Sequence, residues 1–179
     1  MSAGEYTVTR KGRMALITGR RIALAVLALC AMLVAGPRQA AATSLVPFHA
    51  TITETYVVNT TPCQSPAPVT ICSTGTGQAT HLGEIREVAV VESSPGACRV
   101  AERRTTTLTA ANGDQIMLDA TGWNCRTEST ASDTYTVTGG TGRYRGATGR
   151  GTINVTFTPA IREAVVTIDG TLSSPGSLP

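Results

Sequence analysis

Apolar and polar residues alternate along most of the chain after residue 42, with a period of two. This period is typical of β-strands that place one face in a core and the other in solvent. Turn signals rich in glycine, proline, asparagine and serine separate the alternating segments. We therefore expect eight strands, at residues 48–58, 71–82, 84–92, 98–110, 114–124, 133–138, 148–158 and 161–172. Eight antiparallel strands in one small domain predict an all-β barrel or sandwich.

Three charged residues interrupt faces that are otherwise apolar. Glu54 falls on the face of the first segment that also carries Ile52 and Tyr56, and Glu102 and Arg104 fall on the more apolar face of the fourth segment. Such positions allow two interpretations: charged groups that point into the domain, or a strand end, a register shift or an exposed ion pair. We take Glu54, Glu102 and Arg104 as candidate catalytic or polar-anchor residues, because a buried charge is rarely retained without a reason.

The hairpin between the fourth and fifth segments presents a conflict. A four-residue loop, residues 110–113, would set Cys98 directly opposite Cys125, whereas a two-residue Asn-Gly turn would set them two residues out of register. Both registers leave Leu108 on the side opposite to the apolar residues of the fifth segment, although core packing requires them on one side. A β-bulge would reconcile these requirements, and we expect one in this hairpin.

The first 42 residues have the parts of a secretory signal peptide. Basic residues precede an apolar run at residues 22–35, and three alanines at residues 40–42 form a cleavage site of small residues. The apolar run is too short for a membrane-spanning helix. We expect cleavage after Ala42, which leaves residues 43–179 as one domain without a transmembrane segment. The arginine- and alanine-rich character of the chain indicates a bacterial protein that is exported from the cytoplasm.

Removal of this leader changes the charge balance. The whole chain has a formal net charge of +3, but residues 43–179 contain nine arginines, no lysine and eleven acidic residues, a net charge of −2. No basic stripe remains, so we do not expect nucleic acid as a partner. The same segment is rich in threonine and glycine and lacks a long amphipathic helical pattern, as an all-β domain should.

Four cysteines remain after cleavage, an even number in an exported domain, and they predict two disulfides. Of the three pairings we favour Cys63–Cys72, which closes a proline-rich loop, and Cys98–Cys125, which the four-residue hairpin loop would align. A metal site is not expected, because the chain contains no C-x-x-C motif and only two histidines.

The most distinctive motif is glycine-rich and follows the sixth segment. Residues 138–149 read TGGTGRYRGATG. This sequence resembles the Gly-Gly-Thr-Gly-x-aromatic-x-Gly-Ala-x-Gly motif of the allene oxide cyclase and dirigent barrels. Residues 75–83, GTGQATHLG, are similar to the second-strand pattern of secreted bacterial members of that superfamily. The resemblance therefore favours a barrel over a sandwich.

The resemblance implies an eight-stranded, calycin-like antiparallel barrel with an apolar cavity and homo-oligomers in some members. It also implies chemistry without a metal or an organic cofactor, in which the protein shapes a reactive apolar substrate. A structural role is implied for the motif residues Gly139, Gly140, Gly142, Tyr144, Gly146 and Gly149. Allene oxide cyclases place a carboxylate on the first strand inside the cavity, and Glu54 is the residue here that could correspond.

These observations lead to three hypotheses. The first is a secreted barrel that binds a small apolar ligand. The second is a cofactor-free cyclase or isomerase, of the allene oxide cyclase-like or spirotetronate cyclase-like type, with Glu54 or Glu102 as a polar anchor. The third is an envelope or extracellular protein whose barrel interior is fully packed. A cavity would separate the third hypothesis from the first two.

Overall fold

The computed structural model describes residues 44–60, 63, 65–96, 98–125 and 127–173. The predicted signal peptide and the last residues of the predicted C-terminal tail lie outside the described residues. Side chains are described for all of these positions except residues 98–101 and 124.

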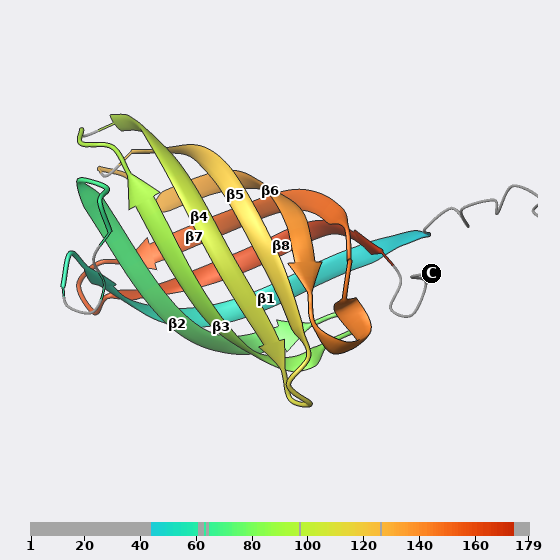
Figure 1. Cartoon of the computed structure of the whole chain (residues 1–179). Helices are drawn as coiled ribbons and strands as arrows, with labels where there is room; N and C mark the ends of the chain where they lie inside the picture. The colour runs from blue at the N-terminus through green and yellow to red at the C-terminus, as the bar shows by residue number, and fades with distance from the viewer. Residues whose placement is uncertain (1–43, 61–62, 64, 97, 126, 174–179) are drawn as a thin grey trace, which may run out of the picture. The chain divides into compact units, whose positions relative to one another are not determined.

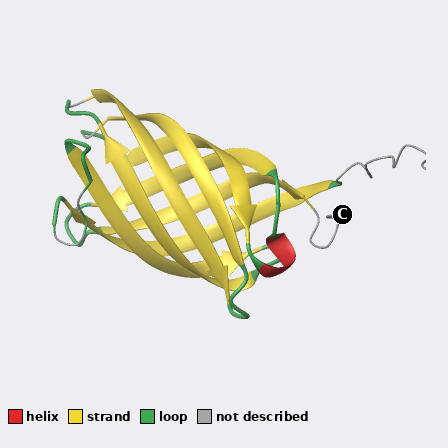
Figure 2. Cartoon of the chain, viewed as in Figure 1, coloured by secondary structure: helices red, strands yellow, loops and turns green. Residues whose placement is uncertain are grey.

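Eight antiparallel strands close into one barrel, so the predicted fold class is confirmed (Figure 1). They are β1 (Leu45–Val58), β2 (Val69–Ala79), β3 (Gly83–Ser93), β4 (Cys98–Ala110), β5 (Gln115–Cys125), β6 (Thr130–Gly140), β7 (Gly149–Thr158) and β8 (Glu163–Ser173). Each strand pairs with the next, and β8 pairs with β1. A single 3-10 turn, Gly142–Tyr144, connects β6 to β7 (Figure 2). Closure leaves no free sheet edge.

The alternation of apolar and polar residues becomes the inside and the outside of the barrel. The buried face of β1 carries Phe48, Ala50 and Ile52, and none of the three is more than 2% exposed. The strand β6 begins three residues earlier than its pattern predicts, at Thr130, and its inward face starts with Ala131. Alanine is too weakly apolar to reveal this extension in the sequence.

The β4–β5 hairpin contains the predicted bulge. Cys98 lies opposite Cys125, the next pair is Val100 with Asn124, and the shift between them leaves one extra residue on β4. Beyond the bulge Leu108 lies opposite Ile116, and both are fully buried. The bulge therefore satisfies both requirements, alignment of the two cysteines and a common core face.

Two ends of the barrel differ in character. The end with the β1–β2, β3–β4, β5–β6 and β7–β8 connections is called the mouth here, and the 3-10 turn lies at the opposite end (Figure 1). At that opposite end the buried Tyr144 donates a hydrogen bond from its hydroxyl to the carbonyl of His81, at 2.6 Å. A side chain at Gly140 would place its Cβ 2.3 Å from the carbonyl oxygen of Gln115. The glycine-rich motif thus packs tightly over this end.

The Cys63–Cys72 disulfide is present and ties the β1–β2 loop to β2, as predicted. The second predicted pairing involves the Cys98 side chain, which lies outside the described part, so that pairing stays a prediction. The backbone register places Cys98 directly opposite Cys125.

Candidate functional site

A pocket of about 280 Å³ opens at the mouth of the barrel. We call it the mouth pocket. Its lining residues come from six strands or their adjoining loops: Tyr56, Val58, Val69, Ile71, Ser93, Cys125, Glu128, Thr130, Phe157 and Pro159. Its volume lies near the lower limit for sites that bind small organic molecules.

Two aromatic rings form one wall of the mouth pocket. The rings of Tyr56 on β1 and Phe157 on β7 meet edge to face, with centroids 5.7 Å apart and an angle of 84°. The edge-to-face arrangement is a favourable geometry for an aromatic pair. Both rings are only partly buried, so they present apolar surface to the pocket.

A charged cluster crosses the barrel interior below this pocket. One nitrogen of Arg104, Nη2, donates to Oε2 of Glu54 at 2.9 Å and to Oε1 of Glu87 at 2.7 Å. Nε of the same guanidinium donates to the Thr106 hydroxyl at 3.1 Å. All four residues are buried. Glu54 and Arg104 therefore lie inside the barrel, and the alternatives of a strand end and of an exposed ion pair are wrong for them.

Burial and neighbouring charges shift the pKa values of Glu87 and Arg104 in this cluster. Burial raises the pKa of Glu87 to about 7, an effect that the charge of Arg104 opposes and the charge of Glu54 reinforces. Burial disfavours the charged form of Arg104, but Glu54 and Glu87 together raise its pKa above the ordinary value. The guanidinium consequently stays charged, while Glu87 exchanges a proton near neutral pH.

Two further carboxyl groups meet beside Arg104. Glu102 on β4, Gly122 on β5 and Asp133 on β6 are consecutive cross-strand partners. A Cβ at Gly122 would lie 2.0 Å from Oδ1 of Asp133, so the absence of a side chain there makes room for that carboxylate. Glu102 and Asp133 are 7% and 2% exposed.

Asp133 is the most unusual of these groups. In the described part of the chain, neither of its carboxylate oxygens accepts a hydrogen bond from a nitrogen or hydroxyl donor, and its polar neighbour is the Glu102 carboxyl. Burial raises its pKa, whereas a hydrogen bond between the two carboxyl groups of Glu102 and Asp133 and the charge of Arg104 both lower it. Burial of a carboxylate without a hydrogen-bond donor is unfavourable in free energy, so such a group is expected either to be protonated or to bind a ligand that supplies a donor.

The strand registers place these groups under the mouth pocket. Glu54 is the next inward residue of β1 after Tyr56, and Ser73 is the next inward residue of β2 after Ile71. Glu102 lies directly across from Ser93, which lines the pocket. The hydroxyl oxygens of Ser73 and Tyr135 are also buried and have no hydrogen-bond partner among the described residues. We call the set beneath the pocket the polar cluster: Glu54, Ser73, Glu87, Glu102, Arg104, Thr106 and Asp133.

The structure thus brings together all three candidates from the sequence and adds residues that sequence reasoning missed. Glu87 was missed because residues 88–91 are apolar on both faces, so the sequence does not show which face of that strand points inward. Asp133 was missed because it stands at the predicted start of its strand. In both cases the alternation of residues between the two faces of the strand was the available signal. Glu87 shares a face with Ile85, and Asp133 shares one with Tyr135 and Val137.

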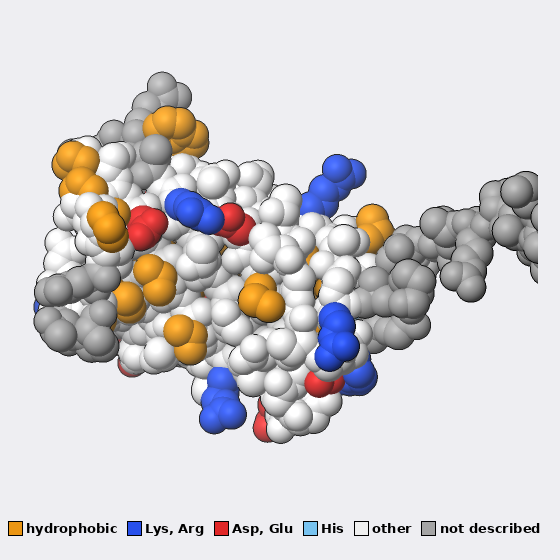
Figure 3. Space-filling view, viewed as in Figure 1, with side chains coloured by type: hydrophobic (Ala, Val, Ile, Leu, Met, Phe, Trp, Pro, Cys, Tyr) orange, Lys and Arg blue, Asp and Glu red, His pale blue; other side chains and the backbone are white. Residues whose placement is uncertain are grey.

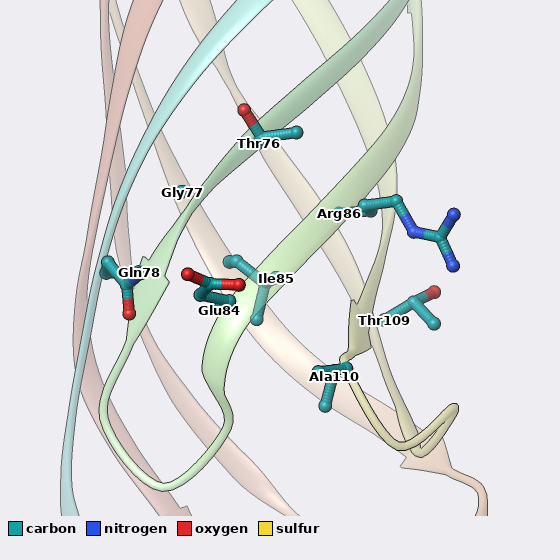
Figure 4. Close-up of a pocket in the computed structure, with 9 residues that line it drawn as sticks. Thr76, Gly77, Gln78, Glu84, Ile85, Arg86, Thr109 and Ala110 are labelled. Carbon is teal, nitrogen blue, oxygen red and sulfur yellow. The ribbon is translucent and has the colours of Figure 1, made fainter.

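Grooves also lie on the outer wall. One of about 610 Å³ runs over β2, β3 and β4, and Figure 4 shows Arg86 extending away from the strands beside it. Most of its polar lining, including Gln78 and Glu84, is exposed. On the face shown in Figure 3, hydrophobic side chains lie in small separate groups, more densely near the mouth. The lining of this groove contains no buried charged group such as those beneath the mouth pocket.

Membrane-spanning helices and metal sites are both absent from the described residues. No helix there is long and apolar enough to cross a bilayer. No group of three or more histidine, cysteine, aspartate or glutamate side chains there is arranged to hold a metal ion.

Comparison with known proteins identifies the fold. No protein-family model matches the sequence, and no curated protein matches it either. Among solved structures, the pterocarpan synthase dirigent proteins GePTS1 and PsPTS1 are each 13% identical to this chain, with a TM-score of 0.51. The alignments cover 72% of this chain and 89% of GePTS1, and 73% of this chain and 95% of PsPTS1.

A further similar structure is a nonspecific haem-binding cyclase that catalyses a [4 + 2] cycloaddition during neoabyssomicin biosynthesis. It is 16% identical, with a TM-score of 0.44, over 94% of this chain and 85% of the cyclase. The chain thus has the barrel fold of the dirigent proteins, and the resemblance that residues 138–149 predict is confirmed at the level of the fold.

Proposed function

We propose that this barrel binds a small molecule with an apolar part in the mouth pocket. The observation that carries the proposal is the pocket itself, a hollow walled by Tyr56 and Phe157 at the open end of the barrel. The opposite end is filled by large buried side chains, among them Phe48, Leu172 and Tyr144. The pocket favours ligand binding over the hypothesis of a fully packed structural barrel.

The Cys63–Cys72 disulfide supports an extracytoplasmic site of action, since disulfides persist in oxidising compartments. Export through the predicted signal peptide and assembly into a homo-oligomer remain predictions.

Native mass spectrometry of the protein secreted by its own host tests the proposal first. A retained small-molecule adduct is the expected result. Chemical-shift mapping with 3-phenyl-1-propanol, a neutral probe, then locates the site. The variant Val69→Phe fills the mouth pocket and should abolish binding, whereas Val88→Phe, the same substitution at an exposed site on the adjacent strand β3, should not. Equal binding by both variants would overturn the proposal.

A second candidate function is a cofactor-free cyclase or isomerase. One observation favours it: Glu87, with a pKa of about 7, lies in a cluster below an apolar pocket, as general acid–base catalysis requires. In such an enzyme the Arg104 guanidinium would stabilise developing negative charge, and the aromatic wall would orient the substrate. Once the adduct identifies a ligand class, Glu87→Gln should abolish turnover and leave ligand binding intact. Unchanged turnover would exclude Glu87 as the acid or base.

A further inference from the structure

The charge balance beneath the mouth pocket is strongly one-sided. In the part of the barrel that the structure describes, four buried carboxyl groups face one buried guanidinium. The guanidinium of Arg104 donates its hydrogen bonds to Glu54, Glu87 and Thr106. Asp133 therefore receives only the charge of Arg104, without a hydrogen bond from it.

The surroundings of Asp133 are those of an incomplete binding site. It is 2% exposed, neither of its oxygens has a nitrogen or hydroxyl donor among the described residues, and its polar neighbour across the side-chain-free position at Gly122 is the Glu102 carboxyl. The Ser73 hydroxyl, 2% exposed and also without a partner, points inward from β2 just below the pocket-lining Ile71. Unpartnered acceptors from two sides of the barrel thus lie beneath one opening.

The rim of the mouth pocket carries aromatic and acidic side chains, which suit a cation as the carboxylates below do. Tyr56 and Phe157 offer aromatic surface that attracts cations as well as apolar groups. Glu128, an additional carboxylate, lies in the lining. Among the lining residues that the structure describes, Glu128 is the one charged side chain, and no arginine is present.

We infer that the mouth pocket takes a small organic cation, such as a protonated primary amine, whose charged group reaches the carboxylates of Asp133 and Glu102. This inference rests on the proposed function, because it names the class of ligand for the same pocket. An ammonium group supplies up to three donors, which suits the oxygens of the adjacent Asp133 and Glu102 carboxylates. The apolar remainder of the ligand packs against Tyr56 and Phe157.

Three probes with one scaffold and different charges test the inference: 3-phenylpropylammonium, 3-phenyl-1-propanol and 3-phenylpropionate. Dissociation constants come from NMR titrations at neutral pH. We expect the ammonium to bind at least about tenfold more tightly than the alcohol, and the carboxylate most weakly, because a desolvated charge-assisted hydrogen bond is strong. Asp133→Asn should remove most of the advantage of the ammonium and leave binding of the alcohol unchanged.

Controls keep the outcomes distinct. Asp119→Asn removes an aspartate on the outer face of β5, where it pairs with Arg103, and should leave the preference intact. Glu102→Gln provides a second interior variant if Asp133→Asn does not fold. Equal binding of ammonium and alcohol would overturn the inference while the proposed function stands. Failure of all three probes to bind would overturn both.

Discussion

The guanidinium of Arg104 on β4 lies 2.7 Å from the carboxylate of Glu87 on β3, and both side chains are buried. The same nitrogen contacts Glu54 on β1, so one cation joins three strands inside the barrel. Breaking a buried charge pair leaves an uncompensated charge in a medium of low dielectric. The arrangement is therefore both a structural element and the source of the electrostatics beneath the mouth pocket.

Substitution of Arg104 by methionine should strongly destabilise the barrel. Glu54 and Glu87 would lose their shared cation, and we expect a loss of about 3–5 kcal/mol in the free energy of unfolding. Urea denaturation measures the change. The neighbouring Arg103 provides a control, because it is 59% exposed in its pair with Asp119. Arg103→Met should change stability by about 1 kcal/mol or less. Similar losses in the two variants would contradict the assignment of a buried network.

The stability of the protein should decrease between pH 4.5 and about pH 7 through Glu87. Its pKa is raised from 4.5 to about 7, so the folded state binds more protons than the unfolded state in this interval. Stability then falls as the pH rises. The contribution is fully present below the unfolded pKa and amounts to roughly 3 kcal/mol across the interval.

The variant Glu87→Gln isolates this effect, because an amide does not titrate. The difference in unfolding free energy between the variant and the natural protein should shift in favour of the variant as the pH rises from 4.5 to 7. Denaturation at a series of pH values measures it. Parallel stability curves for the two proteins would show that the pKa of Glu87 is not raised.

Addition of one methyl group at Gly122 should disturb the polar cluster. The new Cβ would lie 2.0 Å from Oδ1 of Asp133 and 2.5 Å from the carbonyl oxygen of Ser132. Because one of these neighbours is backbone, relaxation is incomplete, and Gly122→Ala should lower stability by about 1–3 kcal/mol. Thermal denaturation measures the loss. Thr121→Ala, at the adjacent exposed position, should stay within about 0.5 kcal/mol of the natural protein. A neutral Gly122→Ala would show that Asp133 does not lie over this position.

Loss of the Cys63–Cys72 disulfide should destabilise the mouth of the barrel. The bond closes a short loop, with a sequence separation of nine. We expect the double variant Cys63→Ala, Cys72→Ala to lose about 2–3 kcal/mol of stability, as short disulfide loops do. Chemical denaturation of the oxidised variant and the oxidised natural protein measures this loss. A variant as stable as the natural protein would show that the bond does not constrain the unfolded chain.

Much of the fold could be predicted from the sequence. The period of two and the turn signals indicate eight strands, because side chains of a strand alternate between two environments. Even the bulge in the β4–β5 hairpin could be expected. Without it, the register that aligns Cys98 with Cys125 would place Leu108 on the face opposite to the apolar residues of β5. The glycine-rich motif indicated which eight-stranded architecture the strands form.

The candidate site could be predicted only in part. The parity of Glu54, Glu102 and Arg104 placed them on apolar faces, which is a local property of each strand. Which residues these three contact could not be predicted from the sequence. Glu87 lies 17 residues from Arg104 and Glu54 lies 50 residues away, so their contact depends on several registers at once.

The tertiary structure decided which charges meet. The stagger of the strands around the closed barrel sets the height of each inward residue, and closure of β8 on β1 brings β1 across from β4. No local pattern encodes that stagger. The sequence by itself therefore determined that charged side chains fall on the apolar faces of two strands. Only the closed barrel determined that they are buried, and that Arg104 pairs with Glu54 and Glu87 beneath an open pocket.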